Sequence, residues 1–293
     1  MNKILIILLL FFSQNVFSQE LSQKVLQEYE DTLSTLAHTM KYGDNENIRL
    51  AANKGFISEL LEVLKYKSSY SYPFDSLKSI SILQPDDNSF RLFNWIIRTD
   101  DGEIKYQAYI VLPSIKKKKN VIIKLQDNSD YQLDFEYQIF NQDNWYGALY
   151  YKIISPKKKN NKYYTILAWD GNSKNSIKKI IDIMEIKGQE VYFGKSIFVK
   201  NKQKSNRVEV EYNSKTSVSV NYDESTKRII FDHLVPLKEN IDGFKSLYVP
   251  DGSYDCYQYK NGKWIFKENI DARIKNTTSK KNNTKEEKGL FRK

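Results

Sequence analysis

Apolar side chains recur at helical spacing over residues 21–66. The first stripe has members mostly three, four or seven positions apart, with Gln, Glu and Lys between them: Leu21, Val25, Leu26, Leu33 and Leu36. Such spacing is typical of an amphipathic helix. A second stripe follows the Gly-Asp-Asn break at 43–45, and Pro73 closes the region because the residue before a proline is disfavoured in the α conformation. We therefore expect a helical segment, with two helices, over residues 19–72.

From Phe74 onward the pattern changes to short apolar runs of strand length. Turn-forming residues separate these runs, as at 101–102, 171–172, 187–188, 213–214, 223–225 and 261–262. Short strands at such spacing predict antiparallel sheets, and the connections are too short for parallel crossovers. We expect a mainly β domain over residues 73–270, either a sandwich or a partly closed barrel, preceded by the short helical segment.

One hairpin is specified residue by residue. Asn261-Gly262 fits a type I′ turn, in which both central residues need a positive φ. That turn pairs Tyr259 with Trp264 and Tyr257 with Phe266 on one face of the hairpin. We expect these aromatic residues to form a core-facing wall rather than a ligand platform. Cys256 falls on the other face.

Two further segments are assigned from their alternation. Residues 208–212 and 218–222 both alternate strictly between apolar and polar side chains, and we expect them to pair as a second hairpin. Residues 177–186 fit either a helical stripe or a strand. We choose a strand because strands are expected on both sides.

The first eighteen residues have the layout of a secretory signal peptide. Lys3 precedes an apolar stretch of nine residues, Ile4 to Phe12, and Val16-Phe17-Ser18 fits a cleavage site before Gln19. A bilayer crossing needs about 20 apolar residues, so a membrane anchor is disfavoured. We expect residues 1–18 to be removed, no transmembrane segment to remain, and the protein to be periplasmic, on the outer surface or secreted.

Charge is unevenly distributed. The formal net charge is +10, and residues 271–293 hold eight Lys or Arg against three Asp or Glu. Because this segment is polar and has no apolar period, we expect a disordered basic tail. An exported chain with about half of its net charge in such a tail does not indicate a nucleic-acid partner.

The residue types needed for several chemistries are scarce. The chain has two His, His38 and His233, and one Cys, Cys256, so an intramolecular disulfide is excluded. A zinc site of His and Cys ligands is disfavoured, and no His-Glu-x-x-His, Gly-x-Ser-x-Gly or glycine-rich phosphate loop occurs. We expect no metal and no cofactor, and we interpret Cys256 as a packing residue rather than a nucleophile paired with His233.

Polar and aromatic residues near the turns are the candidates for ligand binding: Trp169, Asp170, Asn172, Asp232, His233, Asp251 and Asp255. We expect a non-catalytic exported binding module for a glycan, a peptide or an envelope component. The alternative is a glycosidase-like hydrolase that uses a carboxylate pair such as Asp232 and Asp255, since glycoside hydrolysis needs two carboxyl groups about 5 to 10 Å apart.

A series of short motifs runs in order through residues 90–267. It includes the string at 163–172, the Ile-Ile-Asp-Ile at 180–183, the Ile-Ile-Phe-Asp-His-Leu at 229–234, the Asp-Gly-Ser-Tyr-Asp at 251–255 and the closing Asn-Gly-Lys-Trp at 261–264. This order resembles an uncharacterised family of secreted β-rich proteins from Gram-negative bacteria. The resemblance implies export and one continuous β domain, and it carries no activity.

Overall fold

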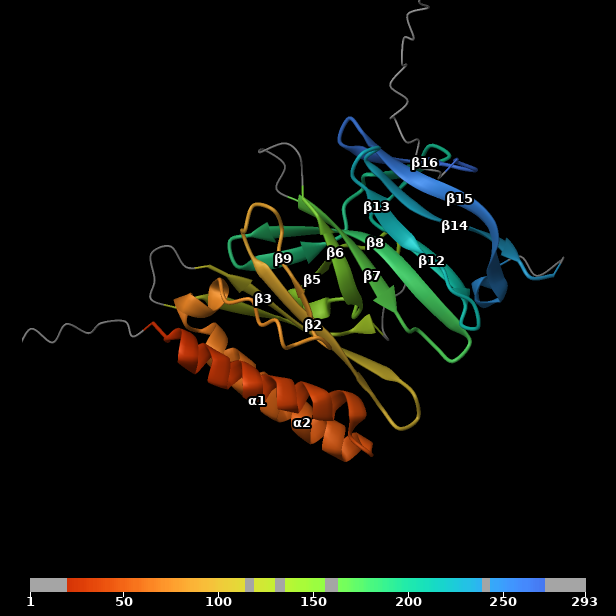
Figure 1. Cartoon of the computed structure of the whole chain (residues 1–293). Coiled ribbons are helices and arrows are strands. Elements are labelled where there is room, and N and C mark those ends of the chain that lie inside the picture. Colours follow the sequence, from red (N-terminus) through yellow and green to blue (C-terminus); the bar gives the residue numbers. More distant parts are fainter. Residues whose placement is uncertain (1–19, 114–118, 130–134, 156–162, 239–242, 272–293) are drawn as a thin grey trace, which may run out of the picture.

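The computed structural model describes residues 20–113, 119–129, 135–155, 163–238 and 243–271 (Figure 1). The expected signal peptide at 1–18 and almost all of the expected tail at 271–293 lie outside these residues.

Both expected helices are present, as α1 (Gln23–Tyr42) and α2 (Glu46–Leu64). Each has a side-chain N-cap, because Ser22 accepts from the Val25 amide and Asn45 accepts from the Ile48 amide. Short 3₁₀ turns follow along the chain: η1 (Lys67–Tyr70), η3 (Gln142–Asn144) and η4 (Lys245–Leu247).

The strands that the structure describes form three sheets. The first has the order β1 (Ser81–Leu83), β2 (Arg91–Arg98), β3 (Ile104–Leu112), β4 (Val121–Leu125). The second has the order β5 (Phe140–Asn141), β9 (Glu190–Phe193), β8 (Ser176–Lys187), β7 (Tyr163–Asp170), β6 (Leu149–Ile154), and β12 (Val208–Asn213) also pairs with β8. The third has the order β11 (Gln203–Ser205), β10 (Phe198–Lys200), β16 (Lys263–Lys267), β15 (Tyr248–Lys260), β14 (Arg228–Pro236), β13 (Val220–Asp223).

Helices and sheets stack in four layers, with the helices against the first sheet and the second sheet between the other two (Figure 1). The neighbours Ile166 and Leu167 on β7 show how the middle sheet is buried on both faces. Ile166 packs toward the first sheet and Leu167 packs toward the third. The mainly β, antiparallel fold is therefore confirmed as stacked open sheets, not a closed barrel. The short pairing of β10 with β16 is parallel.

The ambiguous segment at 177–186 lies in a strand, as expected, and this strand organises the middle sheet. β8 pairs with β7 on one side and with both β12 and β9 on the other. Between the last two, Asp182 is buried and accepts a hydrogen bond of 2.9 Å from Nε of the buried Arg207. Other guanidinium nitrogens donate to the carbonyls of Gln138 and Phe193, and the ring of Phe140 lies 4.3 Å from the guanidinium carbon. The ion pair thus fills the gap between two strands.

The hairpin at Asn261-Gly262 is confirmed in its register. The two central residues have φ of 51° and 80°, and Tyr259 pairs with Trp264. Trp264 is 2 % exposed, belongs to the core between the second and third sheets, and donates through Nε1 to Oγ1 of Thr165 at 3.0 Å. Trp264 is therefore part of the core, as expected. Tyr257 is also buried, whereas Tyr259 and Phe266 are partly exposed.

The predicted pairing of residues 208–212 with residues 218–222 is wrong. Residues 208–212 lie in β12 and pair with β8, whereas Val220–Asp223 form β13 and pair with β14. The two arms contribute their apolar side chains to the same core from opposite sides. Alternation identifies the buried face of a strand but not its partner, and here the two arms belong to different sheets that share one core.

Candidate functional site

A cavity of about 670 Å³ opens where the first and second sheets meet the turn after β7. Trp169, Asp170 and Asn172 line it, so three of the expected ligand-binding residues lie together. The side chains of Tyr106 and Tyr146 also border it, although they come from β3 and from the chain before β6. The sequence reasoning missed both of these tyrosines.

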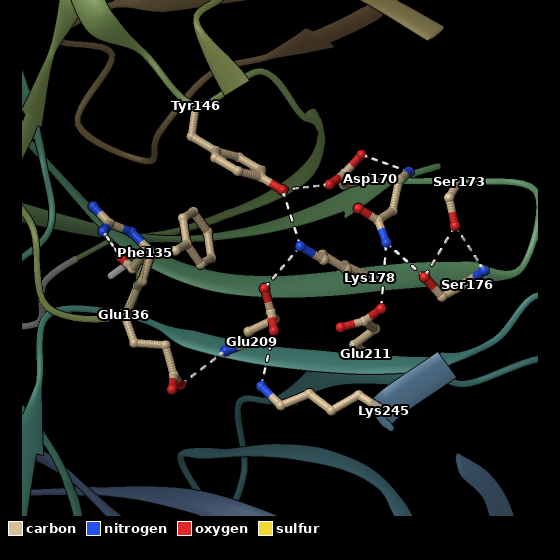
Figure 2. A network of polar contacts seen from close by, with 12 residues as sticks. Phe135, Glu136, Tyr146, Asp170, Ser173, Ser176, Lys178, Glu209, Glu211 and Lys245 are labelled. Carbon is tan, nitrogen blue, oxygen red and sulfur yellow. Dashed lines mark hydrogen bonds and ion pairs between the residues drawn. The ribbon is translucent and has the colours of Figure 1, made fainter. Parts of the chain in front are cut away.

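Asp170 anchors the base of this cavity. It ends β7 on the face that also buries Ala168, and it is 4 % exposed. The Tyr106 hydroxyl donates to Oδ1 at 2.7 Å and the Tyr146 hydroxyl donates to Oδ2 at 2.6 Å. The Asn172 amide donates to Oδ1 at 2.8 Å. Figure 2 shows Tyr146 reaching Asp170. Three donors on one buried carboxylate fix both phenol rings and the following turn.

Both phenols are held in their protonated form. Burial raises the pKa of Tyr106 and of Tyr146, and the negative charge of Asp170 raises each pKa further. The Tyr106 hydroxyl also accepts a hydrogen bond of 2.8 Å from the Gly171 amide. At neutral pH the two hydroxyls therefore act as fixed donors to Asp170.

The turn after β7 depends on its sequence. A Cβ at Gly171 would collide with the side chain of Ile104 and would lie 3.0 Å from the Trp169 ring. Asn172 has φ of 44°, a left-handed conformation that Asn tolerates better than most residues. Glycine and asparagine thus let the turn pass close to Trp169, whose side chain remains partly exposed on the cavity wall.

An ionic chain extends from the cavity across β8 and β12. Lys178 Nζ lies 3.5 Å from the Tyr146 hydroxyl and 3.1 Å from Oε2 of Glu209, and Lys245 Nζ lies 3.0 Å from Oε1 of the same carboxylate (Figure 2). Burial alone would raise the pKa of Glu209, but the charges of Lys178 and Lys245 outweigh it and lower that pKa. Glu211 on the same strand accepts from Asn172 Nδ2 at 3.3 Å.

The remaining candidates lie on the third sheet. His233 Nδ1 and Asp255 Oδ2 are 2.9 Å apart, and Asp255 is 5 % exposed. Asp232, His233 and Asp255 border a second cavity of about 460 Å³. Asp251 is exposed in an irregular part of β15, where its Oδ1 accepts from the amide and hydroxyl of Ser253. The seven expected residues therefore divide between two cavities and one surface turn.

Strand register separates the expected carboxylate pair. Asp255 pairs with Phe231 and Asp232 pairs with Tyr254, so Asp232 and Asp255 point to opposite faces of the β14–β15 ribbon. Asp232 Oδ2 instead accepts from the amide and hydroxyl of Ser219. The register therefore does not direct the two carboxylates toward one another, although both residues border the second cavity.

Cys256 follows Asp255 on β15, so its side chain points away from the face that carries Asp255. It is fully buried, and burial raises the pKa of its thiol. A protonated thiol on the opposite face of the sheet from the His233–Asp255 pair is placed for packing, not for attack on a substrate.

The described residues contain neither a cluster of metal ligands nor a helix suited to span a membrane. No group of three or more His, Cys, Asp or Glu side chains among them is arranged to hold a metal ion. No helix in the same part of the chain combines the length and the apolar character that a membrane crossing requires.

Comparison with known proteins gives no relative. No protein-family model, no curated protein and no solved structure matches the chain.

Proposed function

We propose that the protein is an exported, non-catalytic binding module that takes a neutral glycan in the cavity beside Trp169. The observation that carries the proposal is a partly exposed indole next to a polar network that is already fixed around Asp170. A site fixed before the ligand arrives loses less entropy on binding. Export is supported by the residue pattern at 1–18.

The charge of the cavity wall favours a neutral ligand. Three cationic side chains, Arg98, Lys174 and Lys178, face three carboxylates, Asp101, Glu103 and Asp170. The balance leaves no strong field for an anion or a cation, while it supplies many hydrogen-bond donors and acceptors.

A sugar ring matches this wall chemically. One face of a sugar presents C–H groups that pack on a flat apolar surface such as the Trp169 indole. Its rim presents hydroxyls, which can both donate and accept, and the exposed Asn172, Ser173 and Lys174 offer partners for them. Asp170 has its carboxylate oxygens occupied by tyrosine hydroxyls and an amide, so we assign it the positioning of the site rather than proton transfer.

Calorimetric titration of the full chain with a panel of neutral and charged oligosaccharides tests the proposal. We expect a neutral member to bind, and Trp169→Ala to weaken that binding about tenfold or more, which corresponds to at least about 1.4 kcal/mol. Phe244→Ala is the matched control, because Phe244 is an exposed aromatic, 66 % accessible, that lines neither cavity.

The same panel decides between binding and hydrolysis. Reducing-end assays after prolonged incubation should show no cleavage of the bound oligosaccharide. Cleavage that Asp232→Asn or Asp255→Asn abolishes in a folded protein would replace the proposal with the hydrolase alternative. Failure of every neutral oligosaccharide to bind would also reject it.

A further inference from the structure

The second cavity, about 460 Å³ in volume, differs from the first in its lining and charge. It lies between β12 of the second sheet and the face of the third sheet that carries Asp255. Part of its wall is aromatic, since Phe231, Tyr257 and Phe266 all border it. The rings of Phe231 and Tyr257 are stacked with centroids 6.0 Å apart, and those of Tyr257 and Phe266 are 5.4 Å apart.

The cavity is acidic although the chain is basic. Three lysines and six carboxylate residues border it: Lys200, Lys204, Lys245, Glu136, Glu209, Glu211, Asp232, Asp255 and Glu268. Asp232 points to the other face of the β14–β15 ribbon, and Glu209 is already paired with Lys178 and Lys245. Four carboxylates then remain against two lysines. The formal net charge of the whole chain is +10. An excess of carboxylates within a concave wall of low dielectric concentrates the field and attracts cations.

The negative charges of Glu136 and Asp255 act on Tyr257 in the aromatic wall. Burial raises the pKa of Tyr257, and the charges of Glu136 and Asp255 raise it further, so both carboxylates act on the same phenol. Asp255 is itself buried and held by His233 Nδ1 and by the Asn269 amide at 3.1 Å. A cation beside Tyr257 would therefore meet a fixed carboxylate and an aromatic surface together.

The chain already places one ammonium group on this wall. Lys200 Nζ lies 4.2 Å from the centroid of the Phe266 ring, within the range of a cation–π contact. Lys200 is exposed and Phe266 is partly buried, so the contact sits at the rim of the cavity. The rim thus has the geometry and the charge that accept an alkylammonium ion.

We propose that this cavity is a binding site for a small linear alkylamine, with its ammonium group against the Phe231, Tyr257 and Phe266 rings and paired with Asp255 and Glu136. The volume is within the range of small-molecule sites. The site is separate from the glycan cavity and takes a ligand of a different charge. Its failure would leave the proposed glycan binding untouched.

Titration calorimetry of the full chain with spermidine and with cadaverine tests the site. Pentanediol, which has the length of cadaverine but no charge, is the control ligand. We expect the amines to bind, the diol not to bind, and the amine affinity to fall as salt is raised. Equal binding of cadaverine and pentanediol, or no binding of either amine, would overturn the proposal.

Substitutions locate the amine. Asp255→Asn and Glu136→Gln should each weaken amine binding about tenfold, since each removes a charge near Tyr257. Asp251→Asn is the matched control and should leave affinity unchanged, because Asp251 is exposed and does not border the cavity. Unchanged affinity in a folded Glu136→Gln protein would contradict the assignment even if Asp255→Asn does not fold.

Lys200→Ala gives the sharpest result. If Lys200 occupies the rim that the ligand needs, its removal should tighten amine binding about two- to fivefold, because a competing cation–π contact of about 0.5–1 kcal/mol and a like charge are lost. Lys204→Ala is its matched control, since Lys204 borders the cavity without a ring contact among the described residues. Weaker binding by Lys200→Ala than by Lys204→Ala would place the ligand elsewhere.

Discussion

Trp264→Ala tests whether the aromatic hairpin is part of the core. Trp264 is 2 % exposed, its ring centroid lies 5.0 Å from that of Tyr259, and its Nε1 donates to Thr165 at 3.0 Å. Truncation removes a large buried side chain and leaves a cavity, which costs about 3–5 kcal/mol. With a urea m-value of about 3 kcal/mol/M for a chain of this size, the denaturation midpoint should fall by about 1–1.7 M.

Two control variants divide this loss into its causes. Trp264→Phe keeps a ring in the core but removes the donor to Thr165, so we expect a smaller loss of about 1–2 kcal/mol. Phe244→Ala removes an aromatic that is 66 % exposed and should stay within about 0.5 kcal/mol of the wild type. Circular dichroism during urea titration measures all three, and a Trp264→Ala midpoint close to the wild-type value would refute the assignment of the hairpin to the core.

Three further predictions follow from buried polar groups. Arg207→Met leaves Asp182 buried without its cation and should cost about 3–5 kcal/mol in urea titration, and a loss under about 1 kcal/mol would show that the pair is not structural. Because the folded-state pKa of Glu209 is lowered, its ion pairs stabilise the fold above the unfolded-state pKa of about 4.3 and are lost as pH falls through the folded-state value. The urea midpoints of the wild type and Glu209→Gln should therefore differ at neutral pH and converge in acid, and a constant difference would contradict this. Cys256→Ser should cost at most about 1–2 kcal/mol and leave glycan affinity unchanged, whereas a folded variant without affinity would reveal a role for the thiol.

The periodicity of apolar residues and the positions of turn-forming residues predicted much of the fold. The helical stripes before Pro73 placed α1 and α2, and Asn261-Gly262 defined a register that the structure keeps. Strand pairing between distant segments was not predictable in the same way. The arms at 208–212 and 218–222 carry the right alternation, yet their partners are β8 and β14, because the partner of a strand is decided by tertiary packing.

The candidate site, too, was predictable from the sequence only where its residues are close along the chain. Trp169, Asp170 and Asn172 are close in sequence, and Gly171 between them predicts a turn that places them near one another. Tyr106 and Tyr146 could not be selected from 21 tyrosines, since only the packing of two sheets brings their hydroxyls to Asp170. The sequence does contain one sign of a buried ion pair. An aspartate interrupts the apolar run at 180–184, where a charge needs a partner such as the one that Arg207 provides.

Locating a bound glycan is the most direct test of the proposed site. Chemical-shift mapping of the full chain, titrated with the oligosaccharide that binds best, reports every amide and indole that the ligand approaches. We predict that the largest changes occur at the Trp169 indole and at the amides of residues 171–174, with little change at residues 255–257. Changes confined to the third sheet, or spread evenly over the surface, would contradict the claim that the cavity beside Trp169 is the binding site.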